Sequence, residues 1–152
     1  MKKQILIIAL TALFATGAMA QDVDGLVKMK SEHSVTVTLD RLENILKKKG
    51  ITVAVRWNHS AKAKQVGIEL RETQVLIFGN PKLGSHLMTA EQTAGIDLPL
   101  KALAWKDAGG QVWLAYNDPA YIAKRHHITD RDDVLKKMSY ALAAMTAKAA
   151  GK

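Results

Sequence analysis

The most constraining feature of this chain is an apolar strand pattern that passes directly into a helix start. Residues 75–78 (Val-Leu-Ile-Phe) form a continuous apolar run, which is typical of a central strand. Asn80-Pro81 follows, where asparagine is a good N-cap and proline suits the first helical position. Asp118-Pro119 repeats this pair of signals after alternating apolar residues at 111–116. Strands that lead straight into helices predict a domain built from both.

The remaining elements complete one sheet and its helices. Apolar residues alternate in 26–30 and 51–57, as in strands, and recur at helical spacing in 35–46 and 134–149. A hairpin is expected around Gly109-Gly110. The resulting order is strand, helix, strand, helix, strand, helix, strand, strand, helices. It predicts an α+β fold, with a single mixed sheet of about five strands, helices mainly on one face and a long C-terminal helix.

Three motifs in this chain arrive in an order that a known family shares. L-I-F-G-N-P-K-L-G-S-H-L-M begins at Leu76, D-L-P-L at Asp97 and V-W-L-A-Y-N-D-P at Val112. The chain resembles the domain of unknown function 302 family, a group of small bacterial domains, from about Ser34 to His126. The resemblance implies a compact α+β domain and no particular activity, because the biochemical role of that family is unsettled.

The first twenty residues have the three regions of a secretory signal peptide. Lys2 and Lys3 form the positive start, residues 5–14 the apolar core, and Ala18-Met19-Ala20 the cleavage site. The apolar core is too short to span a bilayer, which needs roughly 20 residues. Cleavage would leave 152 − 20 = 132 residues, residues 21–152, which is one domain by length. We therefore expect a periplasmic or secreted protein with no membrane anchor after cleavage.

Composition excludes several kinds of chemistry. The chain has no cysteine, and hence no disulfide, thiol nucleophile or thiolate metal site. Its net charge is +8, and loss of the two leader lysines would leave 20 basic against 14 acidic residues. The charge is dispersed and the chain carries export signals, so no nucleic-acid partner is expected. The five histidines lack metal-ligand spacing, and there is no phosphate loop, GxSxG or GxGxxG. We expect no metal and no cofactor.

The hairpin predicts a candidate interface. With an even loop at Gly109-Gly110, Lys106 would pair with Trp113, and the hairpin face with the bulkier side chains would pack against the helices. The other face would hold one indole among small neighbours, and such a surface favours a second copy, a ligand or a covering helix. A register slip of one residue would exchange the faces. The candidate interface residues are Ala102, Ala104, Trp113 and Ala115.

Five residues at element ends, with Tyr116 beside them in sequence, form a candidate ligand-binding set, because such ends converge at one edge of an α/β layer. His59, at the end of the second strand, could act as a base or ligand, or could simply bond to backbone. Capping alone would explain Asn80 and Asp118, and Asp97 could fix the turn before Pro99. The set is His59, Asn80, Asp97, Tyr116, Asn117 and Asp118.

Two classes of function remain from the sequence. The leading hypothesis is a noncatalytic binding or self-association module, with a homo-oligomer and a small-molecule ligand as its expected partners. The alternative is a small periplasmic enzyme or ligand-responsive domain that uses His59 with Asp97 and Tyr116. The sequence assigns no catalytic residue.

Overall fold

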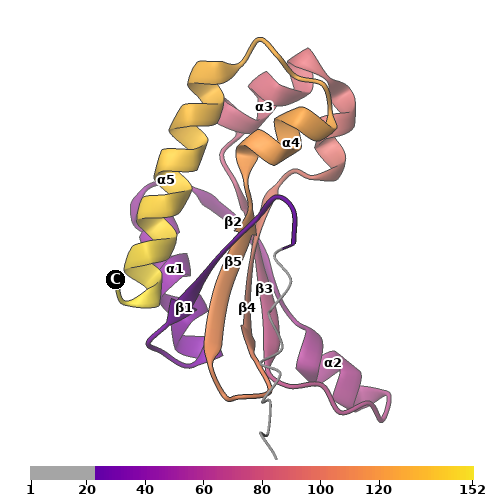
Figure 1. Ribbon diagram of the computed structural model, residues 1–152, viewed down its shortest axis with the longest axis vertical. Helices are drawn as coiled ribbons and strands as arrows, with labels where there is room; N and C mark the ends of the chain where they lie inside the picture. The colour runs from indigo at the N-terminus through magenta and orange to yellow at the C-terminus, as the bar shows by residue number, and fades with distance from the viewer. Residues whose placement is uncertain (1–22) are drawn as a thin grey trace, which may run out of the picture.

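A computed structural model describes residues 23–152, so the predicted signal peptide lies outside the described residues. Within these described residues, five strands and six helical segments follow one another in the predicted order (Figure 1). They are β1 (Leu26–Ser31), α1 (Val35–Lys48), β2 (Thr52–Asn58), α2 (His59–Gln65), β3 (Thr73–Gly79), α3 (Pro81–Ala90), the 3-10 helix η1 (Gln92–Ile96), β4 (Leu100–Lys106), β5 (Val112–Asn117), α4 (Pro119–Arg125) and α5 (Asp132–Ala150).

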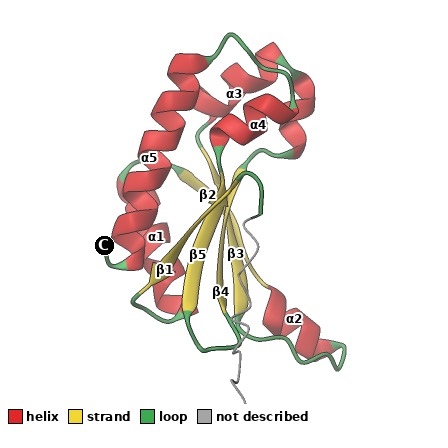
Figure 2. Ribbon diagram, viewed as in Figure 1, coloured by secondary structure: helices red, strands yellow, loops and turns green. Residues whose placement is uncertain are grey.

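The strands form a single sheet in the order β1-β5-β4-β3-β2 (Figure 2). The predicted α+β class, the five strands and the long C-terminal helix are confirmed. The predicted mixed sheet is wrong, because every neighbouring pair is antiparallel. Helix α1 carries the chain from β1 at one edge to β2 at the other edge, so this crossover creates no parallel pair.

The main core lies between one face of the sheet and helices α1 and α5, which lie on the same side of it (Figure 1). Alternate residues of β3 face this core, among them the fully buried Leu76 and Phe78. Helix α1 contributes Leu39, Leu42 and Leu46 at helical spacing. Each fully buried leucine stabilises the fold by about 1.5–3 kcal/mol. The core therefore fixes which face of the sheet is covered.

The hairpin between β4 and β5 does not have the predicted register. Lys106 pairs with Val112, and Trp105 pairs with Trp113. The connection is an odd loop of three residues, 108–110, in which the Gly110 N–H bonds to the Asp107 carbonyl oxygen at 3.2 Å. Gly110 has a φ of 84°, the left-handed conformation that closes such three-residue loops. The assumption of an even loop was wrong by one residue.

This register changes the faces of β4. Ala102 and Ala104 lie fully buried on the helix face, beside Leu114 and Tyr116. Trp105 lies on the opposite face and stacks on Trp113, with ring centroids 6.4 Å apart. The predicted interface therefore does not form one surface.

Candidate functional site

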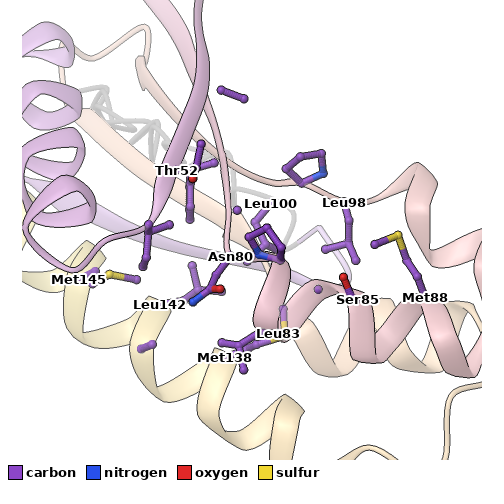
Figure 3. A pocket seen from close by; sticks show the side chains of 18 residues that line it. Thr52, Asn80, Leu83, Ser85, Met88, Leu98, Leu100, Met138, Leu142 and Met145 are labelled. Atoms are coloured by element: carbon purple, nitrogen blue, oxygen red, sulfur yellow. The ribbon is translucent and has the colours of Figure 1, made fainter.

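A cavity lies where α3 and α5 meet the start of β2 and the end of β3 (Figure 3). Its volume is about 380 Å³, within the range of about 300–1,000 Å³ that small-molecule pockets occupy. The side chains that line it are mostly aliphatic or methionine, and they come from four separated parts of the chain. They are Ile51, Thr52, Ala54, Phe78, Gly79, Asn80, Pro81, Leu83, Gly84, Ser85, Met88, Leu98, Pro99, Leu100, Met138, Ala141, Leu142 and Met145.

The cavity has a buried floor and an exposed rim. Phe78, Leu142 and Met145 are among the buried floor residues and belong to the main core. Thr52, Pro81 and Ser85 line the cavity but are exposed to solvent. A molecule entering at the rim would therefore exchange water for apolar side chains.

Polar groups at the cavity are few. The Asn80 side chain accepts a hydrogen bond from the Lys82 backbone N–H at 3.0 Å, as the N-cap of α3. Asn80 therefore begins the helix that forms one wall. The hydroxyl groups of Ser85 and Thr52 stand at the rim (Figure 3). This arrangement suits a molecule that is largely apolar with a single polar end.

Small residues leave room in the wall formed by α3. Gly84 lies in the interior of this helix, where glycine costs about 1 kcal/mol relative to alanine. A Cβ at this position would lie 3.7 Å from the Leu98 Cδ1 atom, an ordinary contact. Neither backbone conformation nor a close contact therefore requires glycine here, and the absent side chain leaves open space in the wall.

The methionines give the cavity an adaptable surface. Met138 and Met145 come from α5, and Met88 comes from α3. Methionine side chains are unbranched and polarizable, so they can adjust to apolar ligands of different shapes. These three methionines were not among the predicted site residues. The spacing of Met138 and Met145 on α5 indicated a buried helix face and gave no sign that this face borders a cavity.

Of the six predicted site residues, only Asn80 lines the cavity. Asp118 is the N-cap of α4 and accepts from the Ala120 N–H at 2.9 Å, so capping explains it. Asn117 ends β5 opposite Leu26.

Tyr116 faces the core beneath the helices and is almost fully buried. Burial raises the pKa of the Tyr116 phenol above its ordinary 10.0, and the charge of Asp118 acts in the same direction. A hydrogen bond with Thr146 acts in the opposite direction. The phenol is therefore neutral at physiological pH, and Tyr116 packs as a residue of the main core.

His59 does not join the other predicted residues. It follows the end of β2 where Asn58 pairs with Gln74, whereas Asn80 follows the end of β3 where Gly79 pairs with Thr52. The length of a seven-residue strand, about 20 Å, separates these two ends of the sheet. The predicted convergence of His59 with the Asn80 turn was wrong, because antiparallel pairing of β2 and β3 places their ends on opposite sides.

Asp97 contacts a histidine, but this histidine is His126 and not the predicted His59. Its Oδ2 atom lies 2.7 Å from Nε2 of His126, and its Oδ1 atom accepts from Arg125 at 3.1 Å. The Nδ1 atom of His126 lies 2.9 Å from the Thr93 hydroxyl. When the His126 imidazole is neutral and the Asp97 carboxylate is ionised, the ring carries its proton on Nε2 and donates it to Asp97. The unprotonated Nδ1 atom then accepts a hydrogen bond from the Thr93 hydroxyl. This chain of bonds joins η1, the loop before β4 and α4.

Two negative findings concern the part of the chain that the structure describes. Within residues 23–152, no three histidine, aspartate or glutamate side chains come close enough together to hold a metal ion. Among the helices of the same residues, none combines the length and apolar character needed to cross a membrane.

Curated relatives match most of this chain. It is 44% identical over 135 residues to "Fluoride-specific ion channel FluC 1" of Brucella suis biovar 1 (strain 1330), a match that covers 88% of the chain and 53% of the relative. The same identity and chain coverage hold for "Fluoride-specific ion channel FluC 2" of Brucella melitensis biotype 1, of which 50% is covered. The chain therefore spans about half the length of these relatives.

A solved structure shares the fold. The crystal structure of an uncharacterized conserved protein DUF302 from Bacillus stearothermophilus superimposes with a TM-score of 0.75 at 17% sequence identity. The match covers 84% of this chain and 99% of that chain. The family model described as "Domain of unknown function DUF302" matches residues 27–145, a wider range than the resemblance read from the motifs. The chain thus belongs to the family of domain of unknown function DUF302.

Proposed function

We propose that this protein is a binding module that holds an apolar small molecule in the cavity between α3 and α5. The observation that carries the proposal is the cavity of about 380 Å³, with a buried apolar floor and a rim open to solvent. A cavity of this kind gains affinity by removing apolar surface from water.

The proposed ligand class is an amphiphile with an alkyl chain and one polar end. The alkyl chain of the ligand fills the cavity floor beside Met138 and Met145, and its polar end lies at the rim beside Ser85. Each methylene removed from water contributes about 0.8 kcal/mol, or about a fourfold gain in affinity. Affinity for a series of alkyl carboxylates should therefore rise with chain length and stop rising once the cavity is full.

A cavity-filling substitution tests this function. Ala141 lines the cavity on α5, and Ala141→Leu places three more carbon atoms there. Ala144→Leu is the matched control, because Ala144 lies on the same helix but is exposed and does not line the cavity. The readout is displacement of a fluorescent apolar probe by decanoate. We expect Ala141→Leu to weaken decanoate binding by about tenfold or more while the folded state is retained.

The control separates occupation of the cavity from general effects on α5. Ala144→Leu should bind the probe and decanoate as the parent does. Equal binding by the parent and by Ala141→Leu would remove the cavity as the site.

The export of the protein belongs to the same proposal. The three regions of the leader in residues 1–20 support delivery to the periplasm, where a carrier of apolar molecules faces water on all sides. The absence of cysteine from the sequence is compatible with an oxidising compartment.

The named relatives favour a second candidate, an accessory role in fluoride transport. The supporting observation is 44% identity over 135 residues to proteins named fluoride-specific ion channels. The cavity is a poor site for fluoride itself, because its apolar lining would not replace the water of a small anion. A ¹⁹F NMR titration of the purified chain with sodium fluoride tests whether the chain binds the anion, and an unchanged fluoride signal would remove direct fluoride binding from this role.

A further inference from the structure

The segment between β2 and β3 projects from the end of the sheet opposite to α3 (Figure 1), the helix that borders the cavity. We call residues 59–72, which comprise α2 and the loop after it, the arm. In the described structure, none of the seven residues of α2 is buried. Helices this short are marginal in water without packing partners. The arm therefore has a surface that the rest of residues 23–152 does not cover.

The exposed surface of the arm is strongly apolar. Val66 and Ile68 have 72% and 60% of their surfaces exposed, and Leu70 and the neighbouring Trp57 are each 45% exposed. The described structure has nine large exposed hydrophobic residues, and these are four of them. Exposed apolar side chains are therefore clustered at the arm. Neighbouring exposed apolar side chains mark interaction surfaces.

The backbone holds these side chains outward. Helix α2 ends in a C-cap turn in which the Ile68 N–H donates to the Ala63 carbonyl oxygen at 3.0 Å and the Gly67 N–H donates to Lys64 at 3.1 Å. Gly67 has a φ of 76°, the left-handed conformation that this turn requires. At the other end, the Asn58 side chain caps α2 by accepting from the Ala61 N–H at 2.9 Å. The apolar tip is thus presented in an ordered turn.

Cations accompany the aromatic side chains on this side of the sheet. The Lys62 ammonium lies 5.4 Å from the centroid of the Trp57 ring. Lys28 and Lys30 lie 5.9 and 5.8 Å from the Trp113 ring, on the sheet face away from α1 and α5. Tryptophan with neighbouring lysine suits a lipid headgroup layer, where the ring sits at the boundary and the ammonium meets phosphate.

The net charge favours an anionic partner. Three basic residues of the arm, Lys62, Lys64 and Arg71, are balanced in part by Glu69 and Glu72, while the chain without its two leader lysines carries 20 − 14 = +6. Two copies of so basic a chain would repel one another. A negatively charged surface would attract it.

We infer that the arm docks on an anionic lipid surface, with Val66 and Ile68 entering the headgroup boundary and the lysines meeting lipid phosphates. The docked state is peripheral: a few aliphatic side chains enter, and no segment crosses the bilayer. The arm and the cavity lie at opposite ends of β2, so the inference does not depend on the ligand proposed for the cavity.

Vesicle flotation of the purified full chain tests the inference. Vesicles of phosphatidylcholine are compared with vesicles of an equal mixture of phosphatidylglycerol and phosphatidylcholine. The test variant is Val66→Ser with Ile68→Ser. The matched control is Val37→Ser with Ile96→Ser, which removes two exposed aliphatic side chains elsewhere. All samples share one N-terminus, so residues 1–22 contribute equally to each.

We expect the parent to bind the anionic vesicles more tightly than the neutral ones, and to lose this preference as salt is added. The arm variant should bind the anionic vesicles about tenfold more weakly, because two aliphatic side chains no longer leave water. Lys62→Ala should weaken binding by about fivefold, corresponding to about 1 kcal/mol for one lysine near an anionic surface. The Val37/Ile96 control should bind as the parent does.

Several results would overturn the inference. One is equal binding of the parent to both kinds of vesicle. Another is an arm variant that binds as tightly as the parent. A fall in the thermal unfolding temperature of the arm variant relative to the control would show that the arm packs within its own chain. A lighter species of the arm variant in sedimentation would assign the arm to a second copy. Tighter binding to single-stranded DNA than to anionic vesicles would assign it to nucleic acid.

Discussion

The Nε2 atom of His126 lies 2.7 Å from the Oδ2 atom of Asp97, and both side chains are largely buried. Asp97→Ala would leave the imidazole without its acceptor and would free Arg125 as well. Loss of one partner of a buried hydrogen bond costs about 1–3 kcal/mol. We expect the free energy of unfolding, measured by urea denaturation, to fall by that amount.

Asp130→Ala serves as the control for this change. Asp130 pairs with Arg131 at the surface, and the Asp130 side chain is mostly exposed. Exposed ion pairs contribute about 0–1 kcal/mol. Equal losses in the two variants would show that the Asp97–His126 contact does not stabilise the fold.

Tyr116 is expected to make the stability of the fold decrease at alkaline pH. Burial raises the pKa of the phenol above its ordinary 10.0, so the folded state holds the phenolic proton more tightly than the unfolded state does. This contribution is complete below pH 10.0 and is lost as the pH rises through the higher pKa of the folded state. Tyr116→Phe removes it. Between neutral pH and pH values above 10, the parent should therefore lose more stability than Tyr116→Phe, as thermal unfolding at each pH will measure.

Gly25 is expected to accept no side chain. A Cβ there would lie 2.1 Å from the Cγ atom of the Tyr121 ring, and the φ of Gly25 is 74°. Gly25→Ala combines overpacking with a strained backbone, each of which costs about 1–3 kcal/mol. Gly50→Ala is the matched control, because its φ is 68° and nothing lies within 4 Å of the added Cβ. A loss in Gly25→Ala no larger than in Gly50→Ala would contradict the close contact with Tyr121.

Export is predicted from residues 1–20 alone. N-terminal sequencing of the protein recovered from the periplasm should begin at Gln21. A full-length chain that remains in the cytoplasm of the producing cell would contradict the prediction.

The local signals in the sequence predicted the element order well. Asn80-Pro81 and Asp118-Pro119 both begin helices with side-chain caps, because capping depends on residues within one turn of each other. The apolar run at 75–78 lies in β3, an interior strand between β4 and β2, because a continuous apolar run favours a strand that is covered by neighbours. The α+β class followed from that order.

Register and long-range convergence were not predictable in the same way. Whether the loop before Val112 has two or three residues depends on one glycine conformation, that of Gly110, and a shift of one residue exchanges the faces of a strand. The position of His59 depended on the direction of β2 relative to β3, which the local sequence does not encode. The cavity depends on how α3 packs against α5, so only Asn80 of its lining was selected in advance.

The methionine methyl groups offer the most direct test of the proposed binding site. Met88, Met138 and Met145 line the cavity, whereas Met29 lies on β1 and does not line it. With ¹³C-methyl methionine, addition of decanoate at constant pH should shift the NMR signals of the three cavity residues and leave the Met29 signal in place. Shifts that saturate on those three signals alone are the result we predict. Unchanged cavity signals, or equal shifts of all four, would contradict binding in the cavity.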